Sequence, residues 1–194
     1  MNLLPFFQTF FQDSYNILWL LCALFIAGVL EAFLWKTPLF EPFNKPINVQ
    51  LFGANKKWRG LISLPLTHAA SVFCLQLVER VLLPVLLPEF ACDRGGLILF
   101  SCFNFLEYGL LVGFIFNLSE LPNSFIKRRL NIPPGDESNP VFFFIDHMDS
   151  TYGTLILWYF YFKFPFHIIA VGLLVAPLLF MLATWIRKRL GLKK

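Results

Sequence analysis

Two aspartates, Asp146 and Asp149, lie three residues apart near the start of an apolar run that covers residues 142–162. Residues three apart on a helix share one face, with Cβ atoms roughly 5–6 Å apart. Carboxylates this close repel each other unless a cation lies between them or one of them binds a proton. Mg²⁺ suits them, because it takes one or two carboxylates together with substrate phosphates. The spacing therefore predicts a magnesium site, to which Glu120 would add a third oxygen ligand.

Basic residues upstream of the aspartates allow a second interpretation. Lys127, Arg128 and Arg129 follow each other in the chain and could pair with the two carboxylates at the membrane interface. Exposed ion pairs contribute only about 0–1 kcal/mol, however, so such a cluster gives a span little reason to carry two acids. Acidic residues inside a membrane span are functional by default. We therefore favour a functional role for the aspartate pair.

A second polar segment, LFGANKKWRG at residues 51–60, leads into another apolar run. It offers an amide, three cations and a stacking ring, in the residues Asn55, Lys56, Lys57, Arg59 and Trp58. Cations at a helix N-terminus suit a polyphosphate, because the free N–H groups and the helix dipole add to their charge. Alternatively they only flank the span and bind anionic lipid headgroups, and charge alone favours that interpretation. Taken with the aspartates, however, the segment supplies the positioning and charge neutralisation that phosphoryl or nucleotidyl transfer requires.

The composition determines which elements must position these residues. The chain has 194 residues, of which 57% are hydrophobic and 14% charged, and its mean hydropathy is +0.65. Soluble domains are roughly 45–50% apolar and about 25% charged, so the excess indicates a polytopic membrane protein. We predict one all-α integral membrane domain over residues 1–194. A span needs about 20 mainly apolar residues, and five stretches qualify: 16–35, 60–78, 96–118, 142–162 and 166–186.

The apolar stretch 81–87 is too short for a span and contains Pro84, so we expect an interfacial or re-entrant segment there. Most of the 16 Lys and Arg residues fall in the first loop, the third loop and the C-terminal tail. Because basic residues concentrate on the cytoplasmic side, five spans predict an N-terminus outside and a C-terminus in the cytoplasm. Both motif-bearing loops would then face the cytoplasm.

Isolated polar residues within the spans have two interpretations. Glu31 and Glu107 could line a cavity or pack as hydrogen-bond partners between helices, and we favour packing. Of the four cysteines, Cys22, Cys74 and Cys102 lie in apolar runs and are expected to be buried. Their spacing indicates neither a zinc site nor a disulfide framework.

Three segments, in this order, resemble membrane cytidylyltransferases that make CDP-lipids, in particular CDP-archaeol synthases and their bacterial relatives. LFGANKKWRG is similar to the family segment LFGxNKTWRG, with Lys57 in place of threonine. SFIKRRLNI, from Ser124 onward, resembles the Ser-Phe-x-Lys-Arg-Arg segment, and DHMDS, from Asp146 onward, resembles Asp-x-x-Asp-Ser. CDP-diacylglycerol synthases are more distantly similar. Glu120 stands where the family usually has an aspartate, and NPVFFF replaces the glycine-rich turn of the diacylglycerol enzymes.

The resemblance implies transfer of CMP from CTP to a lipid phosphate with release of pyrophosphate and with Mg²⁺ as cofactor. It also implies an integral protein of a prokaryotic cytoplasmic membrane whose active site faces the cytoplasm. The partners would be CTP, a lipid phosphate and the bilayer, with no nucleic acid, and a homodimer is left open. The predicted catalytic residues are Asp146, Asp149, Lys127 and Glu120, of which the three acids would hold the metal. The predicted substrate-binding residues are Asn55, Lys56, Lys57, Trp58, Arg59, Ser124, Arg128 and Arg129.

Other functions stay open on the sequence alone. The departures at Lys57 and Glu120 leave room for a non-catalytic relative that binds nucleotide or anionic lipid. A small ion or proton transporter ranks last, because transport requires acids on both sides of the bilayer midplane and the motif residues cluster on one side. The acceptor lipid, with prenyl ether or acyl ester chains, is not determined.

Overall fold

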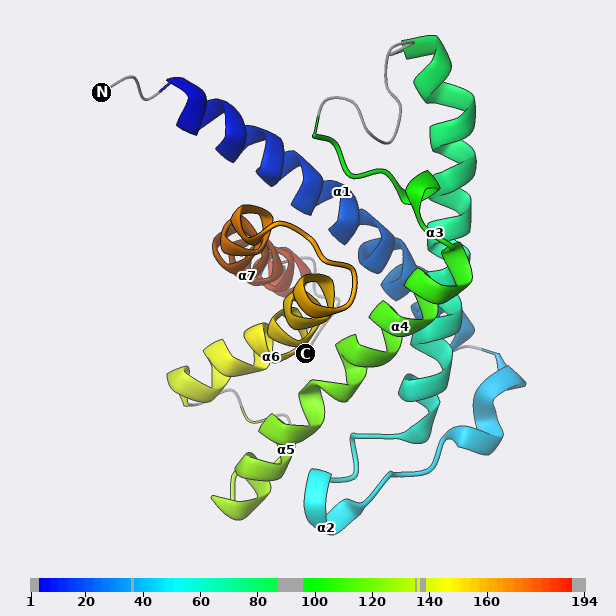
Figure 1. Ribbon diagram of the computed structural model, residues 1–194. Coiled ribbons are helices and arrows are strands. Elements are labelled where there is room, and N and C mark those ends of the chain that lie inside the picture. The colour runs from blue at the N-terminus through cyan, green and yellow to red at the C-terminus, as the bar shows by residue number, and fades with distance from the viewer. Residues whose placement is uncertain (1–3, 36, 87–95, 135, 137–138, 190–194) are drawn as a thin grey trace.

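The computed structural model describes residues 4–35, 37–86, 96–134, 136 and 139–189 (Figure 1). The predicted all-α fold is confirmed, since these residues form helices and no strand, apart from one isolated bridge between Pro46 and Lys57. The long helices are α1 (Leu4–Leu34), α3 (Trp58–Leu86), α4 (Phe105–Leu118), α6 (Pro140–Phe160) and α7 (Phe166–Arg189). The short elements are η1 (Pro38–Phe43), α2 (Val49–Phe52), η2 (Phe100–Cys102) and α5 (Glu120–Arg129).

Three helical segments among the described residues are long and apolar enough to cross a membrane: Gln8–Leu34, Trp58–Val81 and Phe105–Arg129. Phe166–Leu179 is a shorter apolar helix. Large apolar side chains such as Phe11, Phe25 and Phe166 are about 70% exposed, as expected of surfaces that face lipid rather than water. These findings support an integral membrane protein, while the count of five spans and the orientation stay predictions.

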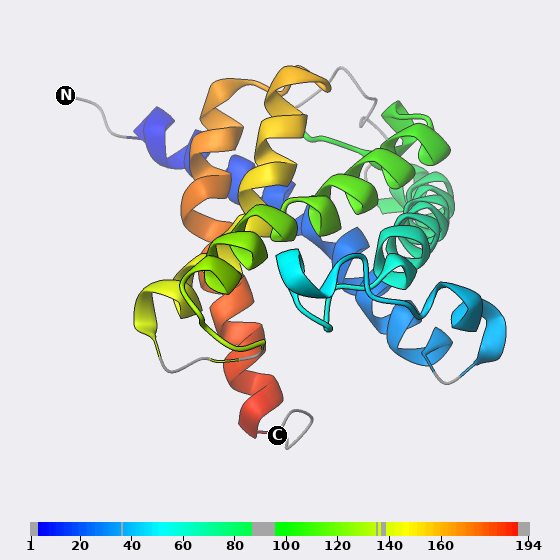
Figure 2. The same ribbon diagram turned by 90° about the horizontal axis from the view of Figure 1, so that it is seen from below.

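The closest helix packing joins α3 to α4. A Cβ added at Gly109 would lie 2.3 Å from the Cα of Ala69, and one added at Gly113 would lie 2.7 Å from the Cα of Pro65. Small residues at such interfaces let two helix backbones approach, which is how helices commonly associate in membranes. α1 packs against α3 and α7, and α6 packs against α4 and α7 (Figure 2). The helices thereby enclose one core around Leu20, and α6 is fixed from both sides.

The prediction of a helix over the whole of 96–118 is wrong for residues 96–104, which are non-helical except for η2. Buried side chains from other helices satisfy the backbone of this segment. The Glu79 carboxylate accepts hydrogen bonds from the backbone N–H groups of Phe100 and Ser101 in this segment, at 2.8 and 2.6 Å. Gln76 donates to two of its carbonyls at 2.7 and 2.9 Å, and Asn16 bonds one N–H and one carbonyl, each at 2.9 Å. Irregular backbone is tolerated in an apolar setting only when it is satisfied in this way.

Of the interfacial or re-entrant segment expected at 81–87, the re-entrant alternative is wrong over 81–86, because α3 continues through these residues to Leu86. An interfacial position for this end of α3 stays a prediction, since the candidate span ends at Val81. Residue 87 lies outside the described residues. Pro84 lies within α3 and lacks the backbone N–H that would bond the carbonyl four residues earlier. The proline therefore lies in a continuing helix and does not start a new element.

The expectations for the cysteines are partly wrong. Cys74 is exposed on α3, and Cys22 is half-buried, both with free thiols. Cys102 is disulfide-bonded and exposed. Cys92 lies outside the described residues. The apolar runs around these cysteines face outward as well as inward, so residence in such a run did not determine burial.

Candidate active site

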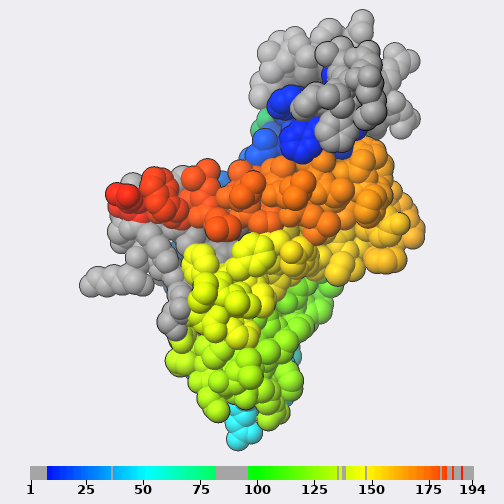
Figure 3. Space-filling model, turned by 90° about the vertical axis from the view of Figure 1, so that its left-hand side faces the viewer, coloured from blue at the N-terminus to red at the C-terminus, as the bar shows by residue number. Residues whose placement is uncertain are grey.

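The two polar loops and the start of α6 meet at one end of the molecule. α2, in the first loop, packs against α5, and α5 packs against α6. In Figure 3 the yellow-green α5 and the start of α6 form one continuous surface at the lower end, with a cyan segment of the first loop at its tip. One face of α5 is buried in this junction and consists of Asn123, Ser124 and Lys127. The fold therefore brings together the three segments that the sequence singled out.

The two aspartates are held by residues of α5. The Nδ2 of Asn123 donates to Asp146 Oδ1 at 2.7 Å and to Asp149 Oδ2 at 2.9 Å. Lys127 Nζ forms an ion pair with Asp146 Oδ2 at 2.8 Å. The sequence interpretation missed Asn123. Its spacing was nevertheless informative, because it lies three residues after Glu120 and four before Lys127, on the same helical face.

Glu120 lies on the other side of this cluster. One of its carboxylate oxygens forms an ion pair with Lys56 of the first loop. The other accepts a hydrogen bond from Ser150 Oγ at 3.0 Å, and the Ser150 backbone N–H donates to Asp149 Oδ1 at 2.7 Å. The result is one continuous network that links all three segments, with the members Lys56, Glu120, Ser150, Asp149, Asn123, Asp146 and Lys127.

The aspartate pair fits a divalent cation. One nitrogen atom bonds both carboxylates at under 3 Å, so oxygens of Asp146 and Asp149 converge on a single point. Two carboxylates plus waters and substrate phosphates form a usual magnesium environment. Glu120 is not part of that convergence, since within the described chain no three His, Cys, Asp or Glu side chains group closely enough to hold a metal ion. Its carboxylate is engaged by Lys56 and Ser150 instead.

Arg59 is directed away from the acidic cluster. Its side chain is 2% exposed, and its Nη2 donates to the carbonyl of Leu34 at the end of α1, at 2.7 Å. The guanidinium lies 4.3 Å from the centre of the Trp35 ring and 3.9 Å from Glu41. A cation at a helix C-terminus is stabilised by the carbonyls exposed there. In this structure Arg59 therefore anchors the first loop to α1.

Three of the predicted first-loop residues, Asn55, Lys56 and Lys57, border an open pocket of about 120 Å³. Its polar lining consists of Asn55, Lys56, Lys57, Asn117 and Glu120, and Trp35 supplies an aromatic wall. Lys57 donates to Asn44 at 2.8 Å and lies 5.7 Å from the centre of the Trp35 ring. Trp58 does not line this pocket and is 49% exposed. The pocket adjoins the network through Lys56 and Glu120, so a ligand bound there would reach both.

The remaining basic residues of α5 point in different directions. The Nε of Arg128 is buried and has no hydrogen-bond partner among the described residues. It lies against Gly53, where φ is +89° and an added Cβ would come 3.0 Å from Asn55 Oδ1 and 3.5 Å from that Nε. Glycine is needed at this position for both its backbone angle and its close contacts. Arg129 instead lies 4.9 Å from the Phe125 ring on the exposed face of α5.

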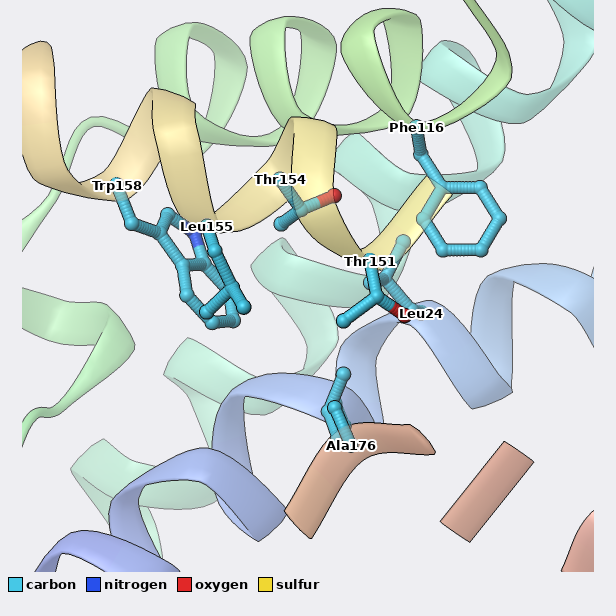
Figure 4. Close-up of a pocket in the computed structure, with 8 residues that line it drawn as sticks. Leu24, Phe116, Thr151, Thr154, Leu155, Trp158 and Ala176 are labelled. Atoms are coloured by element: carbon cyan, nitrogen blue, oxygen red, sulfur yellow. The ribbon is translucent and has the colours of Figure 1, made fainter. Parts of the chain in front are cut away.

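Beneath the aspartates the core is closed. The cavity between α1, α4, α6 and α7 has a volume of only about 10 Å³. Figure 4 shows Phe116, Thr151 and Trp158 among the side chains that border it. Glu31 accepts a hydrogen bond from Ser63 at 2.7 Å, and Glu107 accepts one from Tyr161 at 2.6 Å. Glu31 thus joins α1 to α3, and Glu107 joins α4 to the residue that follows α6, as the packing interpretation favoured.

Comparison with known proteins agrees with the motif resemblance. Residues 44–194 match the model of a family described as CarS-like, CDP-archaeol synthase. A CDP-archaeol synthase of Methanococcoides burtonii is 33% identical over 154 residues, which cover 75% of this chain and 81% of that relative. No solved structure matches the chain. The matched region contains every predicted site residue, and the chain belongs to the CarS-like CDP-archaeol synthase family of cytidylyltransferase enzymes.

Proposed function

We propose that this protein transfers CMP from CTP to the phosphate of a membrane lipid, forming a CDP-lipid and pyrophosphate, with Mg²⁺ as cofactor. The observation that carries the proposal is the single network from Lys56 through Glu120, Ser150, Asp149, Asn123 and Asp146 to Lys127. It combines cations for phosphate with a converging pair of carboxylates for a metal. The membership of the chain in a cytidylyltransferase family supports a substrate site over a structural ion-pair cluster at these groups.

The reaction needs no nucleophile from the protein. An oxygen of the lipid phosphate attacks the α-phosphorus of CTP, a new P–O bond forms, and the bond from that phosphorus to the bridging oxygen breaks as pyrophosphate leaves. The chain's contribution is to position two anionic groups and to offset their repulsion. When bound at Asp146 and Asp149, Mg²⁺ would supply charge neutralisation at the phosphates.

The pocket beside the network is the proposed CTP site. Lys56 and Lys57 line it and would meet the phosphates, while Trp35 offers an aromatic face for the base. Lys127 and Arg128 approach from α5, where they would neutralise the lipid phosphate and the departing pyrophosphate. Arg59 does not line this pocket and anchors the first loop through its hydrogen bond to the carbonyl of Leu34 at the end of α1.

The membrane arrangement follows from the same residues. We propose five spans with the N-terminus outside and the network at the cytoplasmic face, because the basic residues of the first and third loops surround the network and cytoplasmic loops are enriched in Lys and Arg. Similarity to a CDP-archaeol synthase favours an archaeol-type acceptor over a diacylglycerol-type one.

The test is CMP transfer by the purified protein in lipid vesicles. Labelled CTP is supplied with either a prenyl-ether glycerol phosphate or a diacylglycerol phosphate, with Mg²⁺ or with a chelator. We expect label in the lipid fraction with Mg²⁺ only, and more of it with the prenyl-ether acceptor. Absence of lipid-bound label with both acceptors would reject the proposal, and equal incorporation with the chelator would reject the metal.

A further inference from the structure

Asn123 lies at the centre of the network with half of its hydrogen-bonding capacity unused. Its side-chain nitrogen donates to both aspartates, which accounts for both of its hydrogens. Its Oδ1 is buried and has no partner among the described residues. The residue is only 6% exposed, so water does not readily compensate for the missing bond. A buried acceptor without a partner costs roughly 1–3 kcal/mol, which calls for a reason.

We infer that Asn123 Oδ1 is an oxygen ligand of the metal at the aspartate pair, reached by a half-turn of the carboxamide when the cation binds. The inference rests on the proposed function, which places Mg²⁺ at Asp146 and Asp149. Without a cation, the carboxamide offers its positive end to two carboxylates. With a cation there, that end would be repelled and the oxygen attracted.

The surroundings of Asn123 favour this exchange. A half-turn of the carboxamide exchanges its oxygen and nitrogen in place and needs no movement of the α5 backbone. It leaves the amide N–H groups where Oδ1 now lies without a partner, a cost that the bond from oxygen to metal must offset. Amide oxygens are hard ligands of the kind Mg²⁺ accepts. Glu120, the acid expected as third ligand, is already engaged by Lys56 and Ser150. Asn123 supplies an oxygen on the same helix that is already in contact with both aspartates.

A competing role for Asn123 predicts the opposite change in metal affinity. If Asn123 only relieved repulsion between the aspartates in the metal-free protein, its removal would destabilise that state and tighten metal binding. If Oδ1 is a ligand, its removal weakens metal binding, and an acidic replacement restores it. Affinity for a metal in the absence of substrate therefore separates the two roles, whereas activity alone would not.

The experiment measures binding of Mn²⁺, as a paramagnetic probe for Mg²⁺, by electron paramagnetic resonance of the purified full chain without CTP or lipid phosphate. We expect Asn123→Leu to weaken Mn²⁺ binding by about tenfold or more, the scale found when a supporting partner of a metal site is removed. Asn123→Asp should bind at least as tightly as the unsubstituted protein. Unchanged or tighter binding in Asn123→Leu, with Mn²⁺ still bound, would overturn the inference.

Two further variants make the outcomes distinct. Asp146→Asn tests whether the measured Mn²⁺ is bound at the aspartate pair, and if its affinity equals that of the unsubstituted protein, the proposed metal site itself fails. Asn16→Ala removes a buried asparagine whose side-chain hydrogen bonds within the described part of the chain go to backbone groups of Gly96 and Ile98, and it should leave Mn²⁺ affinity unchanged. If Asn123→Leu does not fold, Asn123→Ser, which keeps a small hydroxyl, should bind Mn²⁺ more weakly than both the unsubstituted protein and Asn123→Asp, and equal or tighter binding contradicts the inference.

Discussion

Two regions of this apolar protein bury polar side chains, and they do so differently. Around residues 96–104, Glu79 accepts hydrogen bonds from two backbone N–H groups and from the indole of Trp19 at 2.8 Å. Its partners are neutral: two backbone N–H groups, the Trp19 indole and the Ser101 hydroxyl. At the other end, Asp146 and Asp149 accept hydrogen bonds from Lys127 and from the shared amide of Asn123, and Asp149 accepts one more from the backbone N–H of Ser150. The lysine and the amide are side chains, which a bound ligand could displace.

The contrast separates structural polar groups from functional ones. A carboxylate whose acceptors are filled by backbone donors has nothing to offer a substrate, and it stabilises an irregular segment that would otherwise be costly in an apolar setting. Buried polar atoms without partners among the described residues occur in both regions, as Asn123 Oδ1 and Arg128 Nε at the site and His68 Nε2 and Tyr108 Oη in the helix core. In a chain with 14% charged residues, buried acids are expensive, and what distinguishes the site is that its acids pair with side chains that a ligand can displace.

The largest effect is expected from neutralising the aspartates. Asp146→Asn and Asp149→Asn should each lower kcat/KM for CMP transfer by at least about 100-fold, because each removes a carboxylate that is proposed to hold the Mg²⁺ which neutralises the phosphates. Labelled CTP incorporation measures the loss. Asp13→Asn is the matched control, since Asp13 pairs with His167 away from the network, and it should keep activity. Full activity in both Asp146→Asn and Asp149→Asn would show that the aspartate pair, like Glu79, has only a structural role.

Around residues 96–104 we expect the opposite pattern, a loss of stability without a loss of activity. Glu79→Gln puts an amide nitrogen against backbone donors and should lower the free energy of unfolding by about 1–3 kcal/mol, the cost of leaving a buried group unpaired. The KM for CTP and the kcat of the folded protein should not change. Denaturant unfolding in detergent checks the stability, and Glu107→Gln, at an exposed glutamate bonded by Tyr161, should cost less than about 0.5 kcal/mol. A loss of kcat in Glu79→Gln would show that this region also serves the reaction.

The sequence predicted the site better than it predicted the surrounding backbone. The spacing of Asp146 and Asp149 alone places both on one face of a helix. Lys127 is a cation with which a nearby carboxylate can form an ion pair. The structure brings these residues together. The non-helical segment 96–104 was not predictable in this way, because hydropathy measures side chains and the segment is apolar. What makes it irregular is a set of bonds from other helices.

Two features of the site, like the irregular segment 96–104, depended on tertiary contacts. Asn123 is an ordinary polar residue in the sequence, and it becomes central only when α5 packs against the start of α6. Arg59 resembled a phosphate ligand because it follows two lysines, but the end of α1 lies close enough to take its guanidinium. Residue type and spacing indicated which segments matter, and only the packing of helices decided which side chains face each other.

A smaller effect is expected at Glu120, which joins the two loops. Glu120→Gln loses the ion pair with Lys56 but still accepts a hydrogen bond from Ser150. Because Lys56 lines the proposed CTP pocket, the KM for CTP should rise roughly tenfold while kcat falls less, the scale of about 1.4 kcal/mol. Glu120→Asp keeps the charge on a shorter side chain, so its KM for CTP should lie between that of the unsubstituted protein and that of Glu120→Gln. Steady-state kinetics at varied CTP distinguish these variants, and a fall in kcat at unchanged KM would place Glu120 in the chemical step instead.

The smallest effect is expected at Lys57, where the family segment has threonine. Its ammonium bonds Asn44 and lies near the Trp35 ring, and it has no bond to the network of Lys56 and Glu120 among the described residues. Lys57→Thr should therefore raise the KM for CTP by less than about threefold and leave kcat unchanged, since a half-exposed charge contributes about 0–1 kcal/mol. The increase should vanish at high salt, because salt screens exposed charges. Lys45→Thr, in the same loop but outside the pocket lining, should change neither constant. If Lys57→Thr lowers kcat instead, the lysine acts on the reacting phosphates, and the site region extends further into the first loop than the network of Lys56 and Glu120.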